Sequence, residues 1–329
     1  MISDEDKIMM ETLYWWGIPT LFRCKNDPDP KNCDIALVGV PHSTGNGTTE
    51  RDQHLGPRAV RNISAMLRRS HFKYKIDPWK ENKIHDLGDV PFPEANNNEK
   101  CIESISSFYD HIEKAEKPVV SIGGDHSVTG GIVQSLAKKN SKLTKGKKIT
   151  LVHFDAHTDC YEKLDHFLGA KKSAAHWASY LVKQGNVDPH TSSQIGIRGN
   201  PRTLDWLQAS YDIGYQVITM DEYKEYGHEK CSKMILDRLG DNPIYVTFDL
   251  DCLDATVAPG TANLEPAFRG FNMDEAINLI QSLKGKNVIG GDVACLMPTK
   301  DSPNQITSMV AASIMFEIIC LISVNLKNK

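Results

Sequence analysis

The sequence predicts an α/β fold of three layers, with helices on both faces of a mostly parallel sheet of about eight strands. Short apolar runs rich in valine and isoleucine recur along the 329 residues, nearly continuous in apolar character as strands buried on both faces should be. Stretches of helical period fill the gaps, and this alternation is typical of a parallel sheet. Because no linker composition or internal repeat divides the chain, we expect one domain over residues 1–329.

Each expected strand ends at small or polar residues. The runs are Ile35–Val40, Lys83–Leu87 (the weakest), Val119–Ile122, Ile149–Phe154, Gln194–Ile197, Val217–Thr219, Tyr245–Phe248 and Val288–Val293. The expected helices are Pro57–Leu67, Glu99–Ala115, Val128–Lys138, His176–Lys183, Pro201–Ser210, Tyr223–Leu239, Asp274–Leu283 (after a plausible cap at Asn272) and Asn304–Leu321. Residues 1–30 are expected to form an N-terminal extension, and the proline-containing residues 76–98 an irregular surface excursion.

Composition and charge exclude several classes of partner. A formal net charge of -4 gives no basic footprint for nucleic acid. The first residues are acidic and carry no signal-peptide pattern, and the apolar stretch near Val310–Val324 is too short and too polar to span a bilayer. The eight cysteines are scattered without a CxxC pair, which favours reduced thiols. We therefore expect a cytoplasmic protein without a membrane partner.

Three short polar stretches follow three of the expected strands and carry six candidate metal ligands. These are His126, Asp155, His157, Asp159, Asp249 and Asp251. The carboxyl ends of the strands are where such a sheet binds ligands. A single Asp after a strand is more often a cap or turn former, but four buried carboxylates together would repel one another without cations. Oxygen and imidazole ligands suit manganese, nickel, iron or cobalt, and zinc less well. Two such cations can turn water into hydroxide, which predicts hydrolysis.

The sequences around these ligands resemble three signatures of the ureohydrolases, the family of arginase and agmatinase. The stretches are Gly-Gly-Asp-His-Ser at 123–127, Phe-Asp-Ala-His-Thr-Asp at 154–159, and the segment 248–261, which begins Phe-Asp-Leu-Asp. The likeness covers nearly the whole chain. It implies a three-layer α/β fold around a mostly parallel eight-stranded sheet, assembled as trimers or hexamers. It also implies cleavage of a guanidino C–N bond to urea plus ammonia or an amine.

The resemblance assigns a role to each ligand. It implies that His126, Asp155, Asp159 and Asp249 hold one divalent metal, and that Asp155, His157, Asp249 and Asp251 hold the other. Manganese and nickel are the expected metals, and a hydroxide between them would attack the guanidinium carbon. It implies proton transfer by His176, which could otherwise cap a helix, with Asp125 as a second catalytic candidate. The candidate substrate contacts are His42, Trp177, Thr261, Glu265 and Cys295.

Two positions depart from the family pattern beside these ligands. Cys295 stands where the family usually has a glutamate that grips the guanidinium group, and a thiol offers no charged bidentate acceptor. Alternatively, Cys295 is a buried, inert cysteine. Trp177 stands where relatives usually carry glycine. Its indole would fill the space of a substrate tail, stack on a planar cation, or simply pack in the core.

Two loops also differ from those of the relatives. The loop 160–175 lacks the residues with which arginases read an amino-acid head group, which argues against arginine as substrate. The segment 41–57 contains His42, Glu50, Asp52 and His54 as possible pocket or subunit-contact groups, although each could be a plain surface residue.

These departures favour a ureohydrolase of a small guanidino compound, guanidine or a methylated guanidine, similar to the nickel-dependent guanidine hydrolase branch. The alternative is a guanidino-acid hydrolase of the guanidinobutyrase or guanidinopropionase type, in which Arg198 could pair with a carboxylate tail. Agmatinase and, more weakly, formimidoylglutamase are further alternatives. As an alternative of a different functional class, the chain could be a catalytically silent partner subunit. Silent relatives would be expected to lose metal ligands first, because unpaired buried carboxylates cost stability.

Overall fold

A single nine-stranded sheet forms the centre of the computed structural model, which describes residues 3–6, 13–47, 50–161, 169–201, 203–265 and 269–327. The strands run in the order β1-β3-β2-β4-β9-β8-β5-β6-β7, and every pair is parallel. They are β1 (Lys25–Asn26), β2 (Ile35–Gly39), β3 (Ile84–Asp89), β4 (Val119–Ile122), β5 (Thr150–Phe154), β6 (Ser193–Ile197), β7 (Gln216–Thr219), β8 (Ile244–Asp249) and β9 (Val288–Ala294). The predicted fold class is confirmed, with one strand more than expected.

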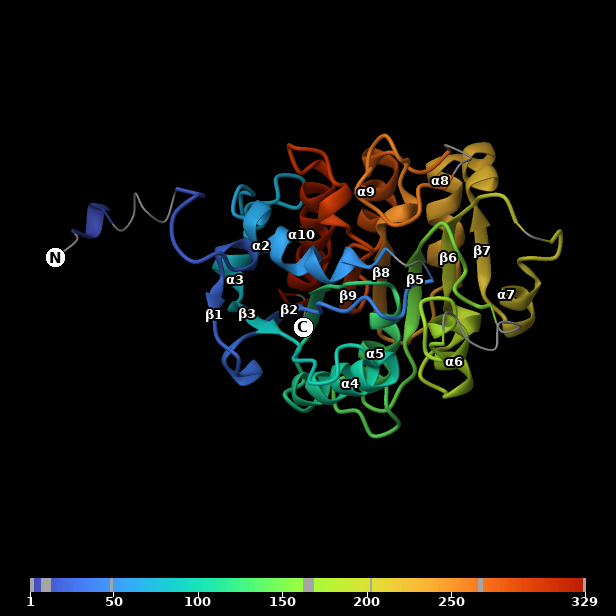
Figure 1. Ribbon diagram of the computed structural model, residues 1–329, viewed down its shortest axis with the longest axis horizontal. Helices are drawn as coiled ribbons and strands as arrows, with labels where there is room; N and C mark the ends of the chain where they lie inside the picture. Colours follow the sequence, from blue (N-terminus) through green and yellow to red (C-terminus); the bar gives the residue numbers. More distant parts are fainter. Residues whose placement is uncertain are drawn as a thin grey trace.

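Helices cover both faces of this sheet (Figure 1). One face carries α2 (Gly56–Ser64), α8 (Met220–Arg238), α9 (Met273–Gln281) and α10 (Ile306–Lys327). The other carries α4 (Asn98–Lys114), α5 (Ser127–Leu136) and α6 (Trp177–Lys183). Side chains alternate along a strand, so in β2 Leu37 joins the core on the first face while Ala36 and Val38 join the core on the second. Two separate cores result, one for each face.

The starts of α8 and α9 are fixed by their sequences. Each helix begins at a capping box, Thr219 with Glu222 and Asn272 with Glu275, in which the two side chains satisfy backbone N–H groups reciprocally. The cap predicted at Asn272 is therefore confirmed.

Two sequence predictions need correction. The excursion predicted over residues 76–98 is irregular only in part, because it contains the short helix α3 (Pro78–Glu81). The weak strand predicted at Lys83–Leu87 is confirmed as β3, which pairs with β1 and β2 inside the sheet. The helix predicted over Pro201–Ser210 is instead α7 (Gln208–Ile213), which ends at Gly214 in the left-handed conformation (φ 109°). Leu204, within the predicted range, is fully exposed to solvent, so it packs no helix against the core there.

The last helix, α10, is more apolar than we expected from its sequence. Its 22 residues are long and apolar enough to cross a membrane by length and composition, contrary to our expectation for this stretch. However, 78% of its apolar window is buried inside the protein, where residues such as Met315 and Ile318 belong to the core. This burial accounts for its composition.

Candidate metal centre

The six predicted ligands meet at one edge of the sheet. They follow β4, β5 and β8, which lie within the run of four neighbouring strands β4-β9-β8-β5. Because all of these strands are parallel, their carboxyl ends share the same edge. Five of the ligands are buried and His157 is partly exposed. The structure therefore brings together all six residues that the motifs predicted.

The ligands form two overlapping groups. The Nδ1 atom of His126 lies 2.8 Å from Oδ2 of Asp155 and 3.2 Å from Oδ2 of both Asp159 and Asp249. The Nδ1 atom of His157 lies 3.3 Å from Oδ1 of Asp155 and 3.2 Å from Oδ2 of Asp251. Asp155 thus offers one oxygen to each group, as expected of a bridging ligand.

A hydrogen-bond chain behind His126 shows that a cation fits the first group. Tyr245, Thr129 and Thr247 all donate hydroxyl protons to the buried Asp292. With its proton given to Asp292, the Thr247 hydroxyl accepts from His126 Nε2, 2.8 Å away. The buried Nδ1 atom of His126 then presents a lone pair to three carboxylates and has no hydrogen-bond partner. A divalent cation satisfies this arrangement, and the chain behind it fixes the imidazole.

The electrostatics of the cluster lead to the same conclusion. Burial and the neighbouring Asp155 carboxylate raise the pKa of Asp159, and burial and Asp249 raise the pKa of Asp251 well above its usual range. Burial also disfavours charge on His126, but its contacts with Asp155, Asp159 and Asp249 outweigh this and raise the pKa of the imidazole well above its usual value. Without a metal, protons occupy the places where positive charge is needed.

His153 was not among the predicted site residues. Its Nε2 atom lies 2.8 Å from Oδ2 of Asp155, and it forms a possible metal-binding group with His126, Asp155 and Asp159. Its Nδ1 atom lies 3.4 Å from the side-chain amide of Gln194. The signal was present in the sequence, since residues 153, 155, 157 and 159 alternate as polar residues with a period of two.

Asp125 and His42 lie in the loops beside the ligands. The Asp125 carboxylate accepts hydrogen bonds from the Gly45 amide (2.8 Å) and from both the amide and the hydroxyl of Ser127. His42 Nε2 lies 3.0 Å from Oδ1 of Asn98. Both side chains are buried and hold loops together, and a catalytic or substrate role for either stays a prediction.

His176 and Thr261 are placed by their local contacts. His176 immediately precedes α6, and its Nδ1 atom lies 2.7 Å from the Ser173 hydroxyl. Thr261 bridges to Leu296, the residue after Cys295, and its hydroxyl donates to the Asn263 carbonyl. Proton transfer by His176 and substrate contact by Thr261 stay predictions.

Glu265, expected among the substrate contacts, contacts the predicted metal ligand His157. Its Oε1 atom lies 2.7 Å from Nε2 of His157, on the side of the ring opposite the carboxylates of Asp155 and Asp251. Gly199, with φ 112°, leaves room for this contact, since a Cβ atom there would lie 2.3 Å from Glu265 Oε2. A carboxylate on the outer nitrogen of a ligand histidine fixes its tautomer and orientation.

Cys295 and Trp177 occupy different surroundings. Cys295 follows β9 with φ 69° and is partly exposed, whereas the other seven cysteines are buried. Burial and the nearby carboxylates of Asp249 and Asp251 raise the pKa of its thiol well above its usual range. Cys295 therefore lies within the site rather than in the inert core. Trp177 is fully buried, which favours core packing over stacking on a substrate.

The structure accounts for several other residues of the two loops. Glu50 pairs with Lys300, and Thr299 donates to Asp52 at 2.8 Å, so these acids tie the segment 41–57 to residues 298–300. His54 Nδ1 lies 2.8 Å from the Arg51 carbonyl. Residues 48–49 and 162–168, parts of the two loops discussed from sequence, lie outside the described residues.

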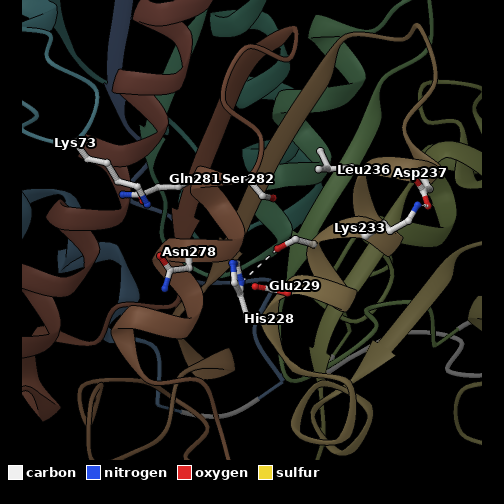
Figure 2. A pocket seen from close by; sticks show the side chains of 10 residues that line it. Lys73, His228, Glu229, Lys233, Leu236, Asp237, Asn278, Gln281 and Ser282 are labelled. Carbon is white, nitrogen blue, oxygen red and sulfur yellow. Dashed lines mark hydrogen bonds and ion pairs between the residues drawn. The ribbon is translucent and has the colours of Figure 1, made fainter.

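A separate surface cleft lies between α8 and α9 (Figure 2). Two of its lysines have polar partners, since Lys73 donates to Gln281 and Lys233 pairs with Asp237. His228 lies within hydrogen-bond distance of Ser232. None of the six predicted metal ligands lines this cleft.

Comparison with known proteins agrees with this geometry. Residues 33–321 match the Arginase family. The chain is 33% identical to a guanidinopropionase of Pseudomonas aeruginosa over 93% of this chain and 92% of that protein. It is 32% identical to the mitochondrial guanidino acid hydrolase of Homo sapiens, covering 92% of this chain and 82% of that protein. The structure of proclavaminate amidino hydrolase from Streptomyces clavuligerus superposes with a TM-score of 0.86 at 27% identity, covering 95% of this chain and 99% of that one.

The buried histidine and aspartate cluster and the family match together make this chain a hydrolase with a binuclear divalent-metal centre. The family match spans most of the chain, and both relatives cover it nearly from end to end. The chain belongs to the arginase family and is a ureohydrolase.

Proposed function

We propose that this ureohydrolase acts on a small guanidino compound, guanidine or a methylated guanidine, with two manganese or nickel ions as cofactors. The observation that carries the proposal is the position of Cys295. It follows β9, which lies between β4 and β8, and its thiol is close enough to the carboxylates of Asp249 and Asp251 for them to raise its pKa. The family resemblance implies a carboxylate here that grips the guanidinium group. A neutral thiol cannot make that charged, two-oxygen contact.

Arg198 also favours a substrate without a carboxylate tail. A guanidino acid would need a cation for its carboxylate, and Arg198 was the candidate from sequence. Its guanidinium is buried and donates to the main-chain carbonyls of Cys252 (3.2 Å) and Leu253 (3.0 Å). Arg198 therefore supports the backbone beside the predicted ligand Asp251, which argues against its serving a substrate carboxylate.

The residues of the site have separate roles in the proposed hydrolysis. Bound divalent cations would supply a water activated at neutral pH and a positive field for the developing charge. Asp155 holds the two ligand groups together, while Thr247 and Glu265 orient the imidazoles of His126 and His157. We propose that His176 delivers a proton to the leaving nitrogen, because an imidazole can both accept and donate a proton near neutral pH.

A guanidino-acid hydrolase is the second candidate function. It is favoured by the relatives, since one is a guanidinopropionase at 33% identity and another a guanidino acid hydrolase at 32%. Such a substrate would need a tail-binding cation other than Arg198.

A substrate panel separates these candidates. The purified protein, loaded with manganese or with nickel, is assayed for urea release from guanidine, methylguanidine, guanidinopropionate, guanidinobutyrate and agmatine. We expect the highest kcat/KM for guanidine or methylguanidine. Turnover of a guanidino acid or agmatine far above that of guanidine would overturn the proposal. Bound metal without urea from any substrate would instead indicate a silent partner subunit.

The variant Cys295→Glu tests the residue that carries the proposal. Restoring a carboxylate at this position should raise kcat/KM for guanidino acids and agmatine relative to that for guanidine, because it returns the charged, two-oxygen contact that the family resemblance implies. A variant with the substrate preference and KM of the natural protein would show that position 295 does not contact the substrate. Cys231→Ser, at a buried cysteine of α8 remote from the ligands, is the control.

A further inference from the structure

The indole of Trp177 makes a polar contact with a metal ligand. Its Nε1–H group donates to Oδ2 of Asp159 at 2.5 Å. The same oxygen lies 3.2 Å from Nδ1 of His126, the atom that faces the expected cation. Because the indole is fully buried, water cannot replace this donor if it is lost.

The same side chain packs against two neighbouring rings. The centroid of the Trp177 ring lies 4.8 Å from that of His126, with the planes inclined at 49°, and 4.8 Å from that of His153, inclined at 63°. His153 in turn contacts Asp155. A single indole therefore touches one histidine ligand, one aspartate ligand and the imidazole behind the bridging carboxylate.

Asp159 needs such support from outside its own loop. Its backbone has φ 51°, the left-handed region that non-glycine residues rarely adopt. It lies beyond the end of β5 (Thr150–Phe154) and so outside that strand of the sheet. Trp177, by contrast, is the first residue of α6 and packs closely on α5, where a Cβ atom at Gly130 would lie 3.0 Å from Trp177 Cβ. The indole connects Asp159 to this rigid pair of helices.

We propose that Trp177 is a positioning residue for the metal centre, which holds Asp159 through its indole N–H group and wedges the rings of His126 and His153. The proposal goes beyond the substrate assignment and rests only on the metal centre. The indole occupies one lone pair of the Asp159 oxygen that faces the cation. It leaves the group of His157 and Asp251, on the other side of Asp155, without a direct contact to Trp177 among the contacts that the described residues make.

The expected effect is selective for one of the two metals. Removing the contact should weaken the metal held by His126 and Asp159 by about 10–100-fold, the usual loss when a group behind a ligand is removed. The affinity of the metal held by His157 and Asp251 should change much less. In the variant, the affinities of the two metal sites should therefore differ more than they do in the natural protein.

The test compares Trp177→Phe with Trp79→Phe. Phenylalanine keeps an aromatic ring but has no N–H group. Trp79 is the matched control, because its indole also donates a hydrogen bond, to the Cys24 sulfur at 3.0 Å, far along the sheet from the ligands. Metal-free proteins are titrated with manganese and with nickel in competition with a chromophoric chelator, and their thermal unfolding is followed without metal.

We expect Trp177→Phe to lose affinity at one metal and Trp79→Phe to keep both affinities. Two unchanged affinities in Trp177→Phe, or equal losses at both metals, would overturn the proposal. If Trp177→Phe unfolds without metal at a much lower temperature than Trp79→Phe, indole NMR of the 15N-tryptophan protein decides. In Trp79→Phe, the indole N–H of the buried Trp177 gives the slowly exchanging resonance. This resonance should shift when the first equivalents of metal are added. A Trp177 resonance whose chemical shift does not change when metal is added would contradict the proposal.

Discussion

His126 and Thr247 are joined by a hydrogen bond of 2.8 Å between the imidazole Nε2 atom and the threonine hydroxyl. The hydroxyl donates its own proton to Asp292, 2.7 Å away. This polarity fixes which nitrogen of His126 carries a hydrogen, and so which nitrogen can bind a cation. A residue on β8 thereby prepares a ligand at the start of α5.

The variant Thr247→Val should therefore weaken metal binding. Valine keeps the shape and the branched strand side chain but neither accepts from His126 nor donates to Asp292. We expect a loss of about 10–100-fold in affinity for one metal, measured by chelator competition. Thr150→Val on the neighbouring strand β5, whose hydroxyl contacts Thr191, is the control. Equal metal affinities in both variants would show that the hydroxyl does not orient His126.

A second prediction concerns Glu265, whose carboxylate lies 2.7 Å from His157 Nε2. In Glu265→Gln the outer nitrogen of His157 loses its charged acceptor, so we expect about 10-fold or greater weakening of the metal near Asp251. Elemental analysis after dialysis against limiting metal should give fewer than two metals per chain. Glu81→Gln, which removes a surface pair with Lys327, should keep the full content. Full occupancy in Glu265→Gln would contradict this role.

Metal removal should make stability depend on pH in a defined direction. Burial alone would lower the pKa of His126 and His157, but contacts with buried carboxylates raise both well above their usual value. Groups with a raised folded-state pKa contribute stability that is fully present below about pH 6.5, the unfolded value, and lost as pH rises through the folded-state pKa. The chelated protein should thus lose thermal stability from pH 6.5 upward.

The metal-loaded protein is the comparison for this experiment, because cations in place of these protons make its melting temperature less dependent on pH in the same range. Differential scanning calorimetry from pH 6.5 to pH 9 measures both forms. A chelated protein that becomes more stable as pH rises would contradict the assignment of these histidines.

The fourth prediction tests the edge of the sheet. Arg61 of α2 donates to both oxygens of Asp86 on β3, at 2.8 and 3.0 Å, and the Asp86 side chain is buried. Arg61→Met leaves this carboxylate without its cation, so we expect a loss of about 3–5 kcal/mol in the free energy of unfolding by urea. Arg269→Met, at an exposed pair with Asp221, should change it little. Similar changes in the free energy of unfolding in the two variants would show that the Arg61–Asp86 pair stabilises the protein no more than an exposed pair does.

The strands, their order along the chain and the six ligands were readable from the sequence. Strands buried on both faces appear as continuous apolar runs, and in a parallel sheet the residues that follow them gather at one edge. The sequence does not predict β1, because its two residues are both exposed and show no hydrophobic alternation. Residues 203–207 were wrongly predicted as part of a helix; Leu204 is fully exposed there and anchors no helix on the core.

What only the tertiary structure decided is which atom faces which. Trp177 and Asp159 are 18 residues apart, and Glu265 and His157 are 108 apart. Local propensity and period carry no information about such pairs, because they depend on how α6 and the loop before residue 265 pack over the sheet. The sequence by itself determined an edge with two histidines and four aspartates. Folding turned Trp177 inward, set Glu265 on the outer nitrogen of His157, and bound Arg198 to backbone carbonyls.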